Sequence, residues 1–247
     1  MSERNEVEIR TPDGTADGEL YEPAAGGTTP GVIMLPDVGG IRDATRGLAA
    51  RLADKGYSVL LVNQYYRTGR APLWSFKPNW AEERTAKRFG EIVGPITPDA
   101  IERDAKAFLE FLASQSGVGS GPVGVAGYCF TGGVALRMAA AQPGRIAAVA
   151  SFHGGGLYTD SPASPHHVLP KVKARLYFAH ADQDRTMPAA AIEKLDAALA
   201  AWGGKYESEV YAGAAHGWTQ TDAAIYNEAQ AERAFGKLTE LLAQTLK

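Results

Sequence analysis

The stretch from Pro122 to Ala140 constrains the fold of this 247-residue chain more than any other segment. Its sequence is PVGVAGYCFTGGVALRMAA: a short apolar run, a glycine-rich turn, and an alanine-rich stretch with no breaker until Pro143. The apolar run is typical of a buried parallel strand, and the last part is typical of a helix. A strand, a tight turn and a helix in this order place Cys129 at the apex of the turn.

Cys129 is the only cysteine of the chain, so it can form no internal disulfide. Glycines near it permit backbone angles and close approaches that a side chain would block. At the apex, its side chain lies at the N-terminus of the following helix, where free N–H groups and the helix dipole favour an anion. The turn therefore predicts a nucleophile. The alternative interpretation of a free cysteine is a small buried hydrophobe.

Length and composition indicate one large domain over residues 1–247, because α/β folds of roughly 200–250 residues often remain undivided. The hydrophobic content of 45% can fill a sizeable core. The net charge of −3 comes with no basic tract, so we expect no nucleic-acid partner. Residues 1–14 are polar and charged, and no apolar run reaches about 18 residues. We therefore expect no secretory leader, no membrane span and a cytoplasmic protein.

Apolar runs that alternate with helical stripes predict a mostly parallel sheet. Strands are predicted at residues 31–35, 57–62, 123–126, 145–151, 174–179 and 205–211, and helices at 43–56, 97–117, 134–142, 188–202 and 223–246. A hairpin over residues 6–21 is expected at one edge of the sheet. Helices joined to strands by short links predict right-handed crossovers, with helices on both faces of the sheet.

Residues 63–98 interrupt this alternation with six aromatic residues and four prolines. A long irregular segment in a compact domain is usually a lid or a binding loop. Its aromatic side chains either line a substrate pocket or pack the loop itself. The candidates for substrate contact, in this segment and at later strand ends, are Tyr65, Tyr66, Arg67, His153 and Trp218.

Two further predicted strand ends carry the partners that a nucleophile needs. Asp184 follows the strand that ends at Ala179, and His216 lies in a small-residue loop after the last strand. The order nucleophile, acid, histidine is that of the α/β-hydrolases, and strand ends are where an open α/β sheet places its ligand crevice. His216 would take the thiol proton or hold the thiolate, and Asp184 would orient the imidazole. Asp182 competes with Asp184 for that role.

A reaction at a carbonyl group also needs two N–H donors for the negative charge that develops on its oxygen. We expect the Phe130 N–H, directly after Cys129, and the Val38 N–H, in the loop after residues 31–35, to supply them. The five histidines and one cysteine show no zinc-ligand spacing, so no metal site is predicted.

With the motifs GYCFTGG, DQDRTMP and AAHGW, the chain resembles the dienelactone hydrolase family over nearly its whole length. Cysteine instead of serine at the turn marks that branch of the α/β-hydrolases. The resemblance implies an α/β-hydrolase fold, a triad of Cys129, Asp184 and His216, and oxyanion donors at Val38 and Phe130. It also implies a cytoplasmic enzyme that needs no cofactor and opens a small lactone.

Three positions depart from the family pattern. Where this chain has Asp37, the family often has a glutamate that contacts the resting thiol. The shorter side chain either keeps this accessory role or only structures its loop. Thr131 replaces a glycine, which makes the turn more crowded. Gln220 replaces an arginine that grips the substrate carboxylate, so the resemblance leaves the lactone substrate open.

The sequence thus predicts a cysteine hydrolase of lactones or small carboxylic esters that forms a thioester, as a monomer or weak homodimer. A general carboxylesterase with a different substrate is the alternative among enzymes. A non-catalytic α/β-hydrolase fold that binds a ligand is the alternative outside them, since function resides in the site and not in the fold.

Overall fold

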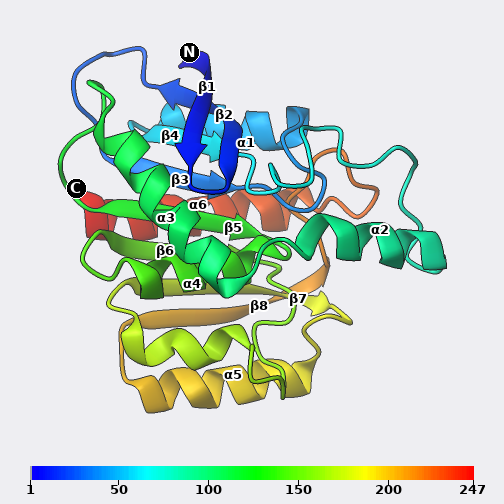
Figure 1. Cartoon of the computed structure of the whole chain (residues 1–247). Coiled ribbons are helices and arrows are strands. Elements are labelled where there is room, and N and C mark those ends of the chain that lie inside the picture. The colour runs from blue at the N-terminus through cyan, green and yellow to red at the C-terminus, as the bar shows by residue number, and fades with distance from the viewer. Residues whose placement is uncertain (1) are drawn as a thin grey trace.

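The computed structural model describes residues 2–247 as one sheet with helices on both faces (Figure 1). Eight strands follow the order β1-β2-β4-β3-β5-β6-β7-β8. The strands are β1 Glu3–Thr11, β2 Gly14–Glu22, β3 Gly31–Leu35, β4 Ser58–Val62, β5 Val123–Tyr128, β6 Ile146–Phe152, β7 Arg175–Gln183 and β8 Tyr206–Ala215. β1 and β2 form an antiparallel hairpin and β2 is antiparallel to β4, whereas the other neighbouring strands are parallel.

All helices but the last lie in the connections between the parallel strands, and the last helix follows the last strand. The helices are α1 Asp43–Ala53, α2 Glu83–Val93, α3 Pro98–Ala113, α4 Thr131–Ala141, α5 Ala189–Trp202 and α6 Glu228–Leu246, with a 3-10 helix at Pro165–Lys171. In Figure 1, α3, α4 and α5 lie in front of the sheet, and α1 and α6 lie behind it. The predicted sheet with helices on both faces is confirmed, as is the hairpin at its edge. Within residues 2–247, no helix has the length and apolar character needed to cross a membrane.

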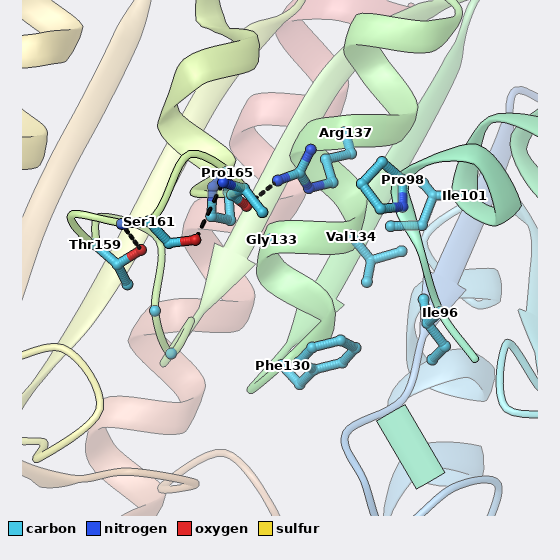
Figure 2. A pocket seen from close by; sticks show the side chains of 13 residues that line it. Ile96, Pro98, Ile101, Phe130, Gly133, Val134, Arg137, Thr159, Ser161 and Pro165 are labelled. Atoms are coloured by element: carbon cyan, nitrogen blue, oxygen red, sulfur yellow. Dashed lines mark hydrogen bonds between the residues drawn. The ribbon is translucent and has the colours of Figure 1, made fainter. Parts of the chain in front are cut away.

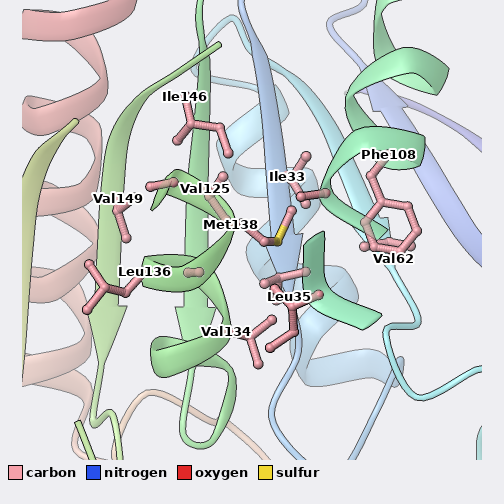
Figure 3. Packing of buried hydrophobic residues seen from close by; sticks show 14 of the residues in the cluster. Ile33, Leu35, Val62, Phe108, Val125, Val134, Leu136, Met138, Ile146 and Val149 are labelled. Carbon is pink, nitrogen blue, oxygen red and sulfur yellow. The ribbon is translucent and has the colours of Figure 1, made fainter. Parts of the chain in front are cut away.

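Alternation along each strand divides the core into two layers. Ile33 and Leu35 of β3 belong to the layer under α3 and α4, whereas Val32 and Met34 belong to the layer under α1 and α6. Figure 3 shows the first layer, where Met138 of α4 lies among side chains of β3 and β5. All residues of β3 are buried, as expected for a central parallel strand. This packing fixes the ends of β3 and β5, where the loops of the candidate site begin.

The segment 63–98 is only partly the irregular loop that the sequence predicts. Residues 63–82 contain neither helix nor strand, but residues 83–93 form α2, which projects beyond the sheet (Figure 1). The helix buries only Thr85 and Ile92 completely, because it is rich in charged residues. Its few apolar residues, which include Phe89, Ile92 and Val93, do follow helical spacing, but the prolines and aromatic residues of the segment favoured an irregular loop instead.

Candidate active site

Cys129 occupies a sharp turn between β5 and α4, with a backbone φ of 60°. Left-handed backbone angles are uncommon outside glycine and persist only where surrounding contacts hold them. The Cys129 N–H donates to the Phe152 carbonyl (3.0 Å) and to His153 Nδ1 (3.1 Å), both at the end of β6. The neighbouring strand therefore holds the strained turn, while Cys129 itself stays half-buried.

Thr131 is an integral part of this turn, which corrects the expectation that it only crowds it. Its buried hydroxyl accepts the Tyr128 N–H (2.7 Å) and lies 2.9 Å from the Leu35 carbonyl, to which it can donate. Gly127 makes room for this arrangement, because a Cβ there would lie 2.2 Å from the Thr131 carbonyl oxygen. The threonine thus ties the Cys129 turn to the end of β3.

Asp184 and His216 meet at the carboxyl ends of β7 and β8. His216 Nδ1 lies 2.6 Å from Asp184 Oδ2. The other carboxylate oxygen accepts the Thr186 N–H (2.8 Å) and the Thr186 hydroxyl (2.6 Å). The Asp184 side chain is 1% exposed, whereas Asp182 is exposed and accepts the Gly213 N–H. The geometry favours Asp184 over Asp182 as the partner of the histidine.

The surroundings of His216 favour its protonated form. Burial disfavours the charge, but hydrogen bonds to Asp184 and Cys129 and the negative charges of these groups outweigh burial and raise the pKa of His216 to about 10. Burial also acts to raise the pKa of Asp184, but the hydrogen bond and charge of His216, with the Thr186 hydrogen bonds, lower it overall. His216 is therefore stabilised in its charged form from two sides.

The N–H groups of Val38 and Phe130 find no hydrogen-bond acceptor among residues 2–247. A free N–H at each position fits the expected oxyanion hole, whose donors must be fixed before substrate binds. The Val38 loop is fixed from two sides. Trp74 Nε1 donates to the Val38 carbonyl (2.8 Å), and Asp37 Oδ1 accepts the Gly39 N–H (2.8 Å).

Asp37 binds Arg42 with both carboxylate oxygens, at 2.6 and 3.1 Å. Arg42 also donates to Asp222 (2.6 Å) and to the side-chain oxygen of Gln220 (3.1 Å). These contacts favour the loop-structuring interpretation of Asp37 over an accessory role at the thiol. Sequence reasoning missed Arg42, because two of its partners lie 178 and 180 residues later in the chain. We call Asp37, Arg42, Gln220 and Asp222 the Arg42 cluster.

A line of hydrogen bonds connects the Arg42 cluster to Cys129. Gln220 Nε2 donates to Thr219 Oγ1 (3.0 Å), Thr219 Oγ1 lies 2.8 Å from His153 Nε2, and His153 Nδ1 accepts the Cys129 N–H. Because Nδ1 is an acceptor, His153 is neutral and its Nε2 carries the proton. Burial lowers the pKa of His153 well below its ordinary value, which agrees with this form. His153 is fully buried, so it supports the turn and does not contact substrate.

The other predicted substrate contacts lie elsewhere. Tyr66 and Arg67 bind Asp104 of α3. Tyr65 and Trp218 are 1% and 0% exposed, inside the core. Each of these side chains is buried or bound to a carboxylate, which disfavours a direct contact with substrate.

A cavity of about 660 Å³ opens beside Cys129, Asp184 and His216; we call it the Cys129 cavity. Trp80 and Phe89 of the 63–98 segment line it. The aromatic rings of that segment also pack edge to face on one another and on the Phe130 ring, so the segment both lines this cavity and packs on itself. No three His, Cys, Asp or Glu side chains in the described part of the chain are grouped as a metal site requires.

Known proteins with similar sequences define the family. The model of the dienelactone hydrolase family matches residues 16–246. A Synechocystis sp. protein, provisionally named a carboxymethylenebutenolidase, is 29% identical over 234 residues, which cover 93% of this chain and 92% of the relative. The carboxymethylenebutenolidase of Pseudomonas putida is 25% identical over 183 residues, covering 74% of this chain and 72% of that protein.

Solved structures show the same fold. A Klebsiella pneumoniae protein, provisionally named a dienelactone hydrolase, superposes with a TM-score of 0.87 at 22% identity and covers 99% of each chain. The dienelactone hydrolase of Anabaena variabilis superposes with a TM-score of 0.68 at 18% identity, covering 100% of this chain and 99% of that one. These similarities confirm the predicted α/β-hydrolase fold. With the family match, they lead to one conclusion: the chain belongs to the dienelactone hydrolase family and is a hydrolase that acts on ester bonds.

Proposed function

We propose that this protein hydrolyses lactones or small carboxylic esters with Cys129 as the nucleophile, through a thioester intermediate. One observation carries the proposal: His216 binds Asp184 and lines the same cavity as Cys129, and its pKa is raised to about 10. A histidine that stays protonated beside a thiol stabilises the thiolate, which is the nucleophilic form.

In the first half of the reaction, the Cys129 sulfur attacks the carbonyl carbon and forms a C–S bond. The negative charge moves to the carbonyl oxygen, where the free N–H groups of Val38 and Phe130 can receive it. When the C–O bond breaks, the leaving oxygen takes the proton of His216. For a lactone, that oxygen remains attached to the acyl group, so the opened ring stays bound as a thioester.

In the second half, His216 is neutral and accepts a proton from water, whose oxygen attacks the thioester. The C–S bond breaks, the carboxylic acid leaves, and the returned proton restores the imidazolium beside the thiolate. Asp184 holds the imidazole by Nδ1 throughout, so Nε2 is the atom that exchanges the proton.

The carboxymethylenebutenolidases among the relatives make a lactone one candidate substrate. The Arg42 guanidinium does not offer the free cation that a lactone carboxylate would need, because Asp37 and Asp222 already bind it. A neutral ester therefore remains the second candidate. Turnover of cis- and trans-dienelactone, measured beside p-nitrophenyl acetate, separates the two.

Trapping the acyl-enzyme tests the mechanism. Mixing the protein with p-nitrophenyl acetate should give a burst of p-nitrophenol equal to the enzyme concentration, with an acetyl group on the peptide that contains Cys129. Iodoacetamide should block both the burst and the turnover. Turnover that survives alkylation of Cys129 would contradict the proposal. If the folded protein shows no burst and its thiol is not alkylated, the result would favour a ligand-binding protein.

A further inference from the structure

A second cavity of about 320 Å³ adjoins the Cys129 cavity (Figure 2); we call it the Arg137 cavity. The two cavities share Phe130, Gly155 and Gly156 in their walls. Gly155 packs directly against the Asp184–His216 side of the site, because an added Cβ would lie 2.6 Å from Thr186 Oγ1 and 3.7 Å from His216 Cε1. A group bound at the thiol therefore needs to pass only the Phe130 ring and two glycines to enter the Arg137 cavity.

One face of α4 forms the long wall of the Arg137 cavity. Phe130, Val134 and Arg137 follow the spacing i, i+4, i+7, which places them on one side of the helix. Figure 2 shows Phe130 and Arg137 at opposite ends, with Val134 between them. Ile96 and Ile101 add apolar surface from the start of α3 and the link before it. The cavity thus runs from an apolar end beside Cys129 to a cationic end.

Arg137 has no carboxylate partner among residues 2–247. Its guanidinium, which carries five N–H donors, donates only to the Ala163 carbonyl. The side chain is half-buried, and burial alone lowers the pKa of Arg137, with no negative charge to offset it. Removing a cation from water without an anion costs free energy, which an anionic ligand would recover.

We propose that the Arg137 cavity is a substrate subsite that binds a carboxylate at the far end of the acyl chain. The preferred substrate is then a half-ester of a dicarboxylic acid, whose apolar chain runs past Phe130 and Val134. The inference rests on the proposed function. Phe130 and Arg137 are about 10 Å apart along the helix axis, so the chain must be of medium length.

The acyl part, and not the alcohol part, fits this subsite. The leaving oxygen takes its proton from His216, so the alcohol lies on the side of that histidine. His216 lines the Cys129 cavity but does not line the Arg137 cavity. The acyl chain is therefore the part of the substrate that can enter between Phe130 and Arg137.

The test compares two esters of equal chain length: p-nitrophenyl octanoate and the mono-p-nitrophenyl ester of suberic acid. The measured quantity is the ratio of their kcat/KM values, half-ester over octanoate. We expect a ratio above one for the wild type. In Arg137→Gln the ratio should fall by about tenfold or more, the loss typical of a hydrogen bond to a charged group. Arg137→Lys should keep part of the preference, because it keeps the charge.

Two control variants separate Arg137 from other cations of the chain. Arg145→Gln removes one positive charge at an exposed position outside both cavities and should leave the ratio unchanged. Arg185 is exposed and lines the Cys129 cavity, so Arg185→Gln tests the competing anchor. Loss of the preference in Arg185→Gln with retention in Arg137→Gln would overturn the proposal.

The outcomes separate this inference from the function on which it rests. Hydrolysis of octanoate without a preference for the half-ester would overturn the subsite and leave the hydrolase mechanism intact. A preference for the half-ester that survives in folded Arg137→Gln would also overturn the subsite and leave the hydrolase mechanism intact. If the wild type fails to hydrolyse either ester and also fails to form the acyl-enzyme described above, both proposals are wrong.

Discussion

Two half-buried arginines near the Cys129 turn have opposite surroundings. Arg42 is held by Asp37 and Asp222 and by the Gln220 side chain. Arg137 donates, among the described residues, only to the Ala163 carbonyl. The folded chain itself completes the first site, whereas the second retains free donors beside a cavity. An arginine whose N–H donors are bound by carboxylates of the chain acts as structural support. An arginine with free N–H donors beside a cavity is available to bind a ligand.

The comparison extends to what each region supports. The Arg42 cluster holds the loop that carries the Val38 N–H and, through Thr219 and His153, reaches the N–H of Cys129. It therefore positions groups that, in the proposed mechanism, act on any ester. The Arg137 cavity touches neither His216 nor Val38, so it can only select among substrates. Changes in the first region should alter kcat, and changes in the second should alter substrate preference.

The largest effect is expected at the thiol that both regions serve. Cys129→Ala and His216→Ala should each lower the kcat for p-nitrophenyl acetate by about a thousandfold or more, because residues of such a group act as a unit. Circular dichroism should show an intact fold. Near-wild-type activity in either variant would mean that the reaction does not take place at Cys129. The roles proposed for Arg42 and Arg137 would then both be wrong.

A smaller loss is expected when the Arg42 cluster is broken. Arg42→Ala frees Asp37 and loosens the Val38 loop, so kcat should fall by about tenfold to a hundredfold, since a displaced oxyanion donor acts mainly in the transition state. KM should change little. Arg42→Lys should recover only part of kcat, because an ammonium cannot bind Asp37 bidentately. A rise in KM with constant kcat would place Arg42 in substrate binding and make the two arginines alike.

Between pH 6.5 and about 10, His216 should make stability depend on pH, whereas both arginines stay charged over this range. The folded-state pKa of about 10 exceeds the ordinary value of 6.5. Its contribution to the free energy of unfolding is therefore full below about pH 6.5 and is lost as the pH rises toward 10. The difference in unfolding free energy between wild type and His216→Gln, from urea titrations, should shrink over this window. A constant difference would contradict the raised pKa.

The sequence predicted the residues whose signal is local. Cys129, Asp184 and His216 each directly follow a strand, β5, β7 and β8, and strand ends can be found from apolar runs. Placing these residues together then required only that the strands be parallel, because their carboxyl ends share one edge of the sheet. The fold was predictable for the same reason, except in α2, a helix rich in charged residues that lies within the proline- and aromatic-rich segment 63–98.

The two arginines could not be predicted in this way. The role of Arg42 depends on Gln220 and Asp222, which lie between β8 and α6, 178 and 180 residues later in the chain. The role of Arg137 depends on the absence of a carboxylate partner among the described residues. A sequence does not show that such a contact is missing. Trp218 shows the opposite case. It was a candidate for substrate contact because it follows His216 closely in the chain, yet its side chain is buried in the core.

The smallest expected effect contrasts one threonine from each region. Thr219 connects Gln220 to His153, and its hydroxyl is buried; Thr159 lines the Arg137 cavity, where its hydroxyl accepts the Ser161 N–H in an exposed loop. Thr219→Val leaves a buried imidazole N–H without an acceptor and should lower the free energy of unfolding by about 1–3 kcal/mol. Thr159→Val should cost less than about 0.5 kcal/mol, because water replaces the lost contact. Urea denaturation measures both. Equal costs would show that hydrogen bonds near the Arg42 cluster are no more structural than those near Arg137, and the division of the site into a supporting and a selecting region would fail.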